Sequence, residues 1–180
     1  MIERSLVLID AENVLNSWWT FCKNNNIRAR IDYDNLIKKV SEDTNLLRAY
    51  FYDGVQDKLP VKKKNFYEAL RRQGIQLRTR VLKDRETTCK QCGFKSTQLL
   101  QKGVDIALAT DILRHAFQKT CDICIIVSGD QDFKDAIEVA KDRGIKVWVV
   151  SFKNSLSREL AMTADRVILL DELFDNIRQS

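Results

Sequence analysis

Two uninterrupted apolar runs, each followed at once by acidic residues, constrain the fold of this chain most strongly. Leu6–Ile9 precedes Asp10, and Ile123–Val127 precedes the turn Ser-Gly-Asp-Gln-Asp at 128–132. Strands without polar alternation are typical of parallel sheets that helices cover on both faces. Open sheets of this kind bind ligands beyond the carboxyl ends of their strands, so the acids are expected at the functional edge.

Helical patterns alternate with further strand-like runs along the rest of the chain. We expect a basic helix over 61–73, an edge strand with one cationic face over 75–82, a helix over 103–117 and a buried strand over 146–150. This alternation predicts one domain over residues 1–180, an α/β three-layer sandwich of Rossmann-like type with a central, mostly parallel sheet. The stretch 84–101 fits no regular element and is interpreted as a cysteine-containing insertion.

Several protein classes are excluded by composition. No 18 consecutive residues are apolar, so no membrane span and no membrane partner are predicted. The first residues lack the basic and long apolar regions of a signal peptide. Five cysteines, an odd number without an export signal, favour a reducing compartment, and we expect a cytoplasmic protein. Nothing in the sequence decides between a monomer and a homodimer.

Positive charge is concentrated in the middle of the chain. Lys58 to Lys102 contains 13 basic and 3 acidic residues, whereas the rest of the chain is net acidic. Such asymmetry predicts a polyanionic partner, and RNA is the leading candidate, although a solvated helix face would give a similar pattern. The candidate nucleic-acid-binding residues are Lys62, Lys63, Lys64, Arg71, Arg72, Arg78 and Arg80.

Acidic residues follow more than one strand, and this predicts a metal site. Asp10 and Asp130 with Asp132 end two strands, Asp53 is expected to end the strand 46–52, and Asp105 begins the helix 103–117. Carboxylates that meet at one edge repel unless a cation neutralises them, and oxygen-only ligands suit Mg²⁺ or Mn²⁺. The alternative for the turn at 128–132 is that Ser128 or Asp130 merely caps the helix that begins near Asp132, with the acids favouring its dipole. Asp111 lies about 240° around the helix from Asp105 and is left out of the ligand set. The lone His115 is interpreted as structural.

Three motifs in order carry a resemblance to a known family. They are Asp-Ala-Glu-Asn at 10–13, Lys-Gly-Val-Asp at 102–105 with its helical continuation, and Ser-Gly-Asp-Gln-Asp-Phe at 128–133. Together they resemble the NYN domain, in particular its LabA-like bacterial branch within the PIN-like nuclease superfamily. The tail around Ser157 and Leu160 is similar to that branch as well.

The resemblance implies a Rossmann-like sheet, an acidic Mg²⁺ site and ribonuclease activity. Carried over residue by residue, Asp10, Asp105, Asp130 and Asp132 are the catalytic, metal-binding acids. Asn13 and Ser128 support them. The expected reaction is hydrolysis of RNA phosphodiester bonds with Mg²⁺ or Mn²⁺ as cofactor.

Two other functions remain open. A non-catalytic RNA-binding or regulatory module of the same fold would keep the cleft without turnover. A Mg²⁺-dependent phosphatase of small molecules would leave the cationic block unexplained. Phosphatases of the haloacid-dehalogenase type also begin with a strand and an Asp, but they have a second Asp where this chain has Glu12.

Cysteines and aromatic residues give two further hypotheses. Cys89 and Cys92 have the spacing of a zinc knuckle, and Cys121 with Cys124 offers a second pair, which core packing explains equally well. A structural Zn²⁺ is therefore a further candidate cofactor. Four aromatic residues are candidates for base stacking, although aromatic residues on amphipathic helices more often pack in the core: Trp18, Trp19, Phe66 and Tyr67.

Overall fold

The computed structural model of the chain describes residues 2–88, 95–100 and 103–179. A six-stranded sheet forms its centre, and neighbouring strands in it are all parallel. In order across the sheet, the strands are β3 (Gln76–Val81), β2 (Asn45–Val55), β1 (Arg4–Asp10), β6 (Ile123–Val127), β7 (Lys146–Ser151) and β8 (Arg166–Leu169). The predicted α/β three-layer sandwich is confirmed.

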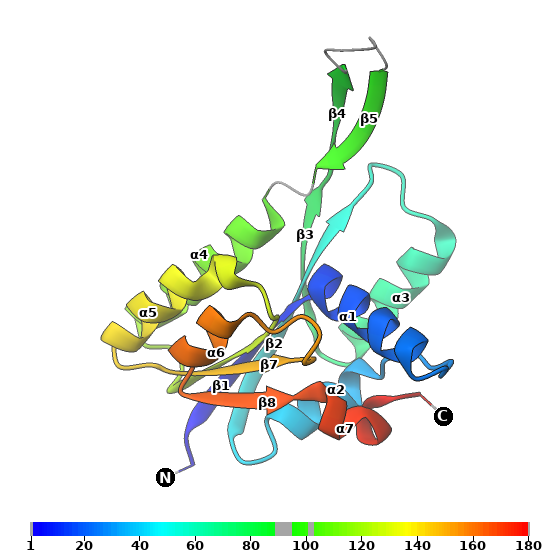
Figure 1. Ribbon diagram of the computed structural model, residues 1–180. Helices are drawn as coiled ribbons and strands as arrows, with labels where there is room; N and C mark the ends of the chain where they lie inside the picture. The colour runs from blue at the N-terminus through cyan, green and yellow to red at the C-terminus, as the bar shows by residue number, and fades with distance from the viewer. Residues whose placement is uncertain (1, 89–94, 101–102, 180) are drawn as a thin grey trace.

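Helices cover both faces of the sheet (Figure 1). One face carries α1 (Ala11–Asn24), α2 (Tyr33–Val40), α3 (Val61–Arg72) and α7 (Leu170–Ile177). The other face carries α4 (Val104–Gln118), α5 (Lys134–Asp142) and α6 (Arg158–Thr163). A short 3₁₀ turn, η1 (Gln131–Phe133), leads into α5.

The buried strands explain why two hydrophobic cores form, one on each side of the sheet. Successive side chains of a strand point to opposite faces. Val7 and Ile9 of β1 therefore pack against α1, whereas Leu6 and Leu8 pack against α4 and α5. Because both faces are covered, the middle of β1, Leu6–Ile9, and the whole of β6 consist of apolar residues without polar alternation.

Two expectations about the middle of the chain were wrong. The stretch interpreted as lacking regular structure contains the antiparallel hairpin of β4 (Lys83–Thr88) and β5 (Lys95–Leu100), which projects from the body in Figure 1. Its strands are mostly polar, so hydrophobic periodicity gives no signal there. β2 also continues past Asp53 to Val55, because β3 pairs with its last residues.

In the described residues, no helix combines the length and the apolar character that crossing a membrane requires.

Candidate active site

The sheet changes its winding direction between β1 and β6, and the motifs at 10–13 and 128–133 meet there. β1 and β6 are hydrogen-bonded neighbours with Ile9 opposite Val127. The Ser128 hydroxyl donates to Asp10 Oδ2 at 3.0 Å, and the Gly129 N–H donates to Asn13 Oδ1 at 3.0 Å. The ends of both strands are therefore tied together at the topological switch point, where open α/β sheets bind ligands.

Asp10 is the most enclosed carboxylate of this edge. Only 5% of the residue is exposed, and its Oδ1 accepts the Asn13 N–H at 3.3 Å as the N-cap of α1. Burial raises the pKa of Asp10 to about 6, against the opposing effect of the hydrogen bonds from Asn13 and Ser128. The charges of Asp105 and Asp130 raise this pKa further.

Asp130 caps η1 while facing the same edge. Its Oδ1 accepts the Asp132 N–H at 3.0 Å, and its own N–H donates to the Ser128 hydroxyl at 3.2 Å. The capping interpretation of the turn at 128–132 is thus correct for Asp130, and Asp10 is also a helix N-cap. Capping does not compete with ligand binding, because Asp130 caps with Oδ1 alone, and Asp10 caps with Oδ1 while its Oδ2, which accepts the Ser128 hydroxyl, keeps a second lone pair.

Asp105 brings a third chain segment to the cluster. It lies in the first turn of α4, which begins after Gly103 in a left-handed conformation (φ 115°). Asp105 as a whole residue is exposed, but neighbouring atoms partly bury its carboxyl group, and this burial raises the pKa of Asp105. The charges of Asp130 and Asp132 raise the same pKa further. We call Asp10, Asp105, Asp130 and Asp132 the acidic cluster.

The acidic cluster has the donor chemistry of a site for a hard divalent cation. It offers carboxylate oxygens only, and its buried member has a raised pKa that a nearby cation would lower. Among the described residues, however, no three Asp, Glu, His or Cys side chains lie close enough together to hold one ion. The residues therefore fit the cation in chemistry, and binding requires their side chains to move closer together.

Two other acids of the sequence lie outside the cluster. Asp53, inside β2, accepts the Tyr67 hydroxyl at 2.7 Å and pairs with Lys63 at 3.0 Å on the α3 side. Asp111 is 2% exposed and accepts the Tyr52 hydroxyl at 2.7 Å on the α4 side. Both carboxylates are held by hydroxyl and cationic partners, so their role is structural.

The predicted basic residues divide between the two faces of the sheet. Arg78 and Arg80 lie on the α4 side and line a groove of about 470 Å³ together with Arg114. Lys62 and Lys63 lie on the α3 side and line a different cavity. Lys64, Arg71 and Arg72 are exposed on α3.

Arg114 was missed by sequence reasoning. It pairs with Asp111 three residues earlier on α4, and Arg78 Nε approaches the same carboxylate at 3.4 Å. The spacing of Asp111 and Arg114 is a usable signal, because residues three apart on a helix are neighbours. The sequence does not show, however, that Asp111 is buried, and this burial is what holds the Asp111–Arg114 ion pair in place.

A serine-rich loop after β7 was also missed. The Ser157 N–H donates to the Gly129 carbonyl at 3.0 Å, so the loop lies against the acidic turn. A Cβ on Gly129 would lie 2.2 Å from the Ser155 carbonyl oxygen and 2.6 Å from the Ser151 hydroxyl. Only glycine permits this close approach, which positions Asp130.

The NYN domain family matches residues 4–171 of the chain. This chain belongs to the NYN domain family. NYN domains form part of a nuclease superfamily, and the matched range includes every member of the acidic cluster.

Two relatives and one solved structure extend the comparison. The chain is 32% identical over 128 residues to the low amplitude and bright protein LabA of Synechococcus elongatus, covering 71% of this chain and 64% of LabA. An uncharacterised Methanocaldococcus jannaschii protein is 37% identical over 76 residues, which are 42% of this chain and 32% of that protein. The chain thus spans less than two thirds of these relatives.

The fold of this NYN domain is also similar to a solved structure. A Vibrio parahaemolyticus protein of unknown function aligns with a TM-score of 0.71 at 21% identity, over 99% of this chain and 97% of that one. The likeness supports the fold alone.

The described cysteines of this NYN domain lie in its hydrophobic interior. Cys89 and Cys92 lie outside the described residues. Cys121 and Cys124 are 1% and 2% exposed among apolar side chains, and burial raises the pKa of both thiols. Cys22 is likewise buried, on α1.

Proposed function

We propose that this NYN domain is a metal-dependent ribonuclease that hydrolyses RNA phosphodiester bonds at the acidic cluster. One observation carries the proposal most directly: the Ser128 hydroxyl donates to Asp10 Oδ2 at 3.0 Å and so joins the acidic ends of β1 and β6. Besides burial, the charges of Asp105 on α4 and of Asp130 raise the pKa of Asp10, which agrees with carboxylates from three segments lying near one another. Assembling like charges is unfavourable, and a divalent cation is the ordinary means of relieving it.

In this proposal the acidic cluster holds Mg²⁺ or Mn²⁺. When bound, such an ion supplies an activated water at neutral pH and neutralises charge at the phosphate. Ser128 and Asn13 orient the ligands, because the Ser128 hydroxyl fixes Asp10 and the Asn13 amide fixes the backbone of Gly129. Hydrolysis forms a bond between water oxygen and phosphorus, breaks one phosphorus–oxygen ester bond, and leaves a proton on the departing oxygen.

Cations on both sides of the acidic cluster would attract the RNA backbone. On the α4 side, the groove next to Asp105 is lined by Arg78, Arg80 and Arg114. On the opposite side, α3 presents Lys62 and Lys63. Arginine and lysine bind phosphates largely independently of sequence, so this arrangement favours contacts to the backbone rather than to particular bases.

The decisive experiment compares RNA cleavage by the wild type, Asp130→Asn and Asp135→Asn. Asp135 is an exposed acid in the first turn of α5, so its substitution makes the same chemical change outside the cluster. Wild type and Asp135→Asn should cleave single-stranded RNA with Mg²⁺ or Mn²⁺ and stop with a chelator, whereas Asp130→Asn should lose activity. Equal cleavage by all three proteins would overturn the assignment.

A second function is a non-catalytic RNA-binding or regulatory module. It is favoured by the spacing of the described acids, because no three of them lie close enough together to hold one ion. It predicts RNA binding that weakens steeply with salt, survives Asp130→Asn, and is never accompanied by cleavage with any metal. Binding that does not respond to salt would count against this second function.

A further inference from the structure

A cavity of about 460 Å³ lies between α1 and α3, away from the acidic cluster's own side chains. We call it the aromatic cavity, because Trp18, Trp19, Tyr33 and Phe66 line it. Its volume falls in the range of about 300–1,000 Å³ that is usual for ligand sites. The Tyr33 hydroxyl is buried without a hydrogen-bond partner in the described chain, a condition that is uncommon in native proteins.

Trp19 differs from its neighbour Trp18 in a way that packing does not explain. Trp18 is 1% exposed and stacks on Phe174 with ring centroids 4.8 Å apart. Trp19 is 56% exposed and borders both the aromatic cavity and an adjoining hollow that Arg28 and Arg30 line. A large aromatic face is thus available to a partner.

The rim of the aromatic cavity is positively charged. Lys62 and Arg30 line the cavity, Arg28 lies beside it, and none of the three forms an ion pair within the described chain. Among the described residues that line the cavity, the acid is Asp53, and it is already paired with Lys63. An occupant should therefore combine a flat apolar ring with negative charge, which is the chemistry of a nucleotide.

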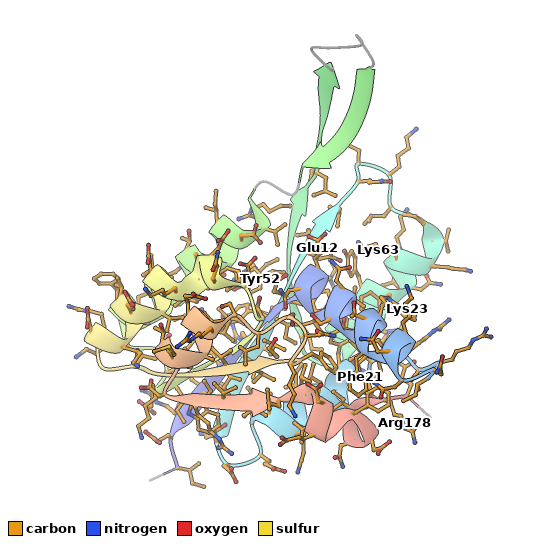
Figure 2. The ribbon with its side chains drawn as sticks, in the orientation of Figure 1. Glu12, Phe21, Lys23, Tyr52, Lys63 and Arg178 are labelled. Carbon is orange, nitrogen blue, oxygen red and sulfur yellow. The ribbon has the colours of Figure 1, made fainter. Side chains whose placement is uncertain are left out.

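A groove of about 390 Å³ continues from the aromatic cavity toward the acidic cluster. It shares Leu15, Asp53 and Lys63 with the cavity and is also lined by Glu12. Figure 2 labels Glu12 and Lys63 above the start of α1. Trp19 follows Asp10 by nine residues, about 14 Å along α1 at 1.5 Å per residue. A few nucleotides of extended strand span that distance.

We propose that the aromatic cavity binds an unpaired nucleobase of the RNA whose phosphodiester bond lies at the acidic cluster. The base stacks on Trp19, while Lys62, Arg28 and Arg30 contact the flanking phosphates. This inference rests on the proposed function and narrows its substrate class to RNA that is single-stranded on the α1–α3 side. A base within a duplex remains stacked and paired, so duplex RNA cannot enter the cavity.

Binding of a fluorescein-labelled single-stranded RNA, measured by anisotropy with a chelator present, tests this site without cleavage. Trp19→Ala should weaken binding about 5- to 100-fold, the usual loss on removing one stacking partner. Phe117→Ala is the matched control, because Phe117 is 57% exposed on α4, which covers the opposite face of the sheet. Lys62→Ala should likewise weaken binding more than Lys64→Ala on the same helix.

The outcomes separate this inference from the proposed function. Equal RNA affinity of Trp19→Ala and Phe117→Ala would overturn the assignment of the cavity to a nucleobase. This result is expected if a protein segment occupies the cavity instead. Metal-dependent cleavage by the wild type would still support the proposed function. Equal affinity of the wild type for duplex and single-stranded RNA would overturn the inference as well. Wild type that binds no RNA would refute both. Unchanged circular dichroism and melting temperature of each variant establish that the fold is intact.

Discussion

Replacing Asp10 by Asn should stabilise the metal-free protein at alkaline pH. Burial of the carboxyl, aided by the charges of Asp105 and Asp130, raises the pKa of Asp10 from 3.8 to about 6. A difference of one in pKa corresponds to about 1.4 kcal/mol, so ionised Asp10 costs the folded protein about 3 kcal/mol. Asparagine keeps the shape and the capping oxygen without the charge, so most of this cost should disappear.

The direction of the pH dependence follows from the raised pKa. Below about pH 4, Asp10 is protonated in both the folded and the unfolded protein and carries no penalty. Between about pH 4 and 6 the unfolded protein releases its proton first, so the free energy of unfolding falls as pH rises. Above about pH 6 the loss is complete. Asp10→Asn should therefore remove a decline of about 3 kcal/mol between pH 4 and 8.

Urea unfolding at pH 4, 5, 6, 7 and 8 with a chelator present measures this effect by linear extrapolation. Asp32→Asn is the matched control, because Asp32 caps α2 through the same bond, with its carboxylate accepting the Asn35 N–H at 3.0 Å. Only Asp10→Asn should gain stability at pH 8. Added Mg²⁺ should then stabilise the wild type, by about 2.7 kcal/mol at 100 times its dissociation constant, and Asp10→Asn much less.

The reasoning would be refuted by an Asp10→Asn variant whose free energy of unfolding at pH 8 equals or falls below that of the wild type. An equal gain in the free energy of unfolding by Asp32→Asn would also refute the reasoning, because the gain would then come from helix capping and not from the buried charge of Asp10.

Three further predictions concern residues of the acidic cluster's surroundings and of the buried Asp111, and urea unfolding measures each. Gly129→Ala should cost at least about 2 kcal/mol, because its Cβ would lie 2.2 Å from a backbone oxygen of the loop after β7. Tyr52→Phe should cost about 1–3 kcal/mol, because buried Asp111 loses a hydroxyl donor at 2.7 Å. Ser128→Ala should raise the pKa of Asp10 further and steepen the fall of stability with pH, because a hydrogen bond that lowers this pKa is lost.

Controls for these variants lie elsewhere in the chain. Gly54→Ala places its Cβ 2.5 Å from Leu82 Cδ2, the end of a side chain that can turn away, so it should cost less than Gly129→Ala. Thr20→Val removes a hydroxyl that donates to Asn16 on the surface of α1 at 2.9 Å, so it should cost less than Tyr52→Phe. Equal losses within either pair would contradict the structural explanation.

Much of the fold could be predicted from the sequence because buried strands require runs of apolar residues, which the sequence shows directly. The apolar runs before Asp10 and Ser128 are needed only where both faces of a strand are covered, so they identify the central pair of strands. The order of the sheet then brings these two strand ends together. The prediction failed at β4 and β5, because their mostly polar sequences contain no such apolar run.

The candidate nucleic-acid-binding residues, which the sequence gives as one set, lie on two faces of the sheet. Alternation in the edge strand predicts that Arg78 and Arg80 share one face, but it does not say which face. Arg78 packs toward Asp111 on the α4 side, whereas α3, with Lys62 and Lys63, covers the other side. The choice depends on the handedness of the connections and on the register of β3 with β2, which are properties of the assembled sheet.

Capping and metal binding, which began as alternatives for the turn at 128–132, are compatible in this geometry. Asp130 uses Oδ1 to accept the Asp132 N–H, and this bond fixes the carboxylate against the end of β6. The comparison of Asp130→Asn with Asp130→Ala therefore separates the two roles. Asparagine is nearly as good a cap as aspartate, whereas alanine costs about 0.5–2 kcal/mol of stability. If Asp130 only caps, Asp130→Asn should keep the response of the wild type to Mg²⁺. If it also binds the ion, Asp130→Asn should fold as stably as the wild type in a chelator and lose its stabilisation by Mg²⁺.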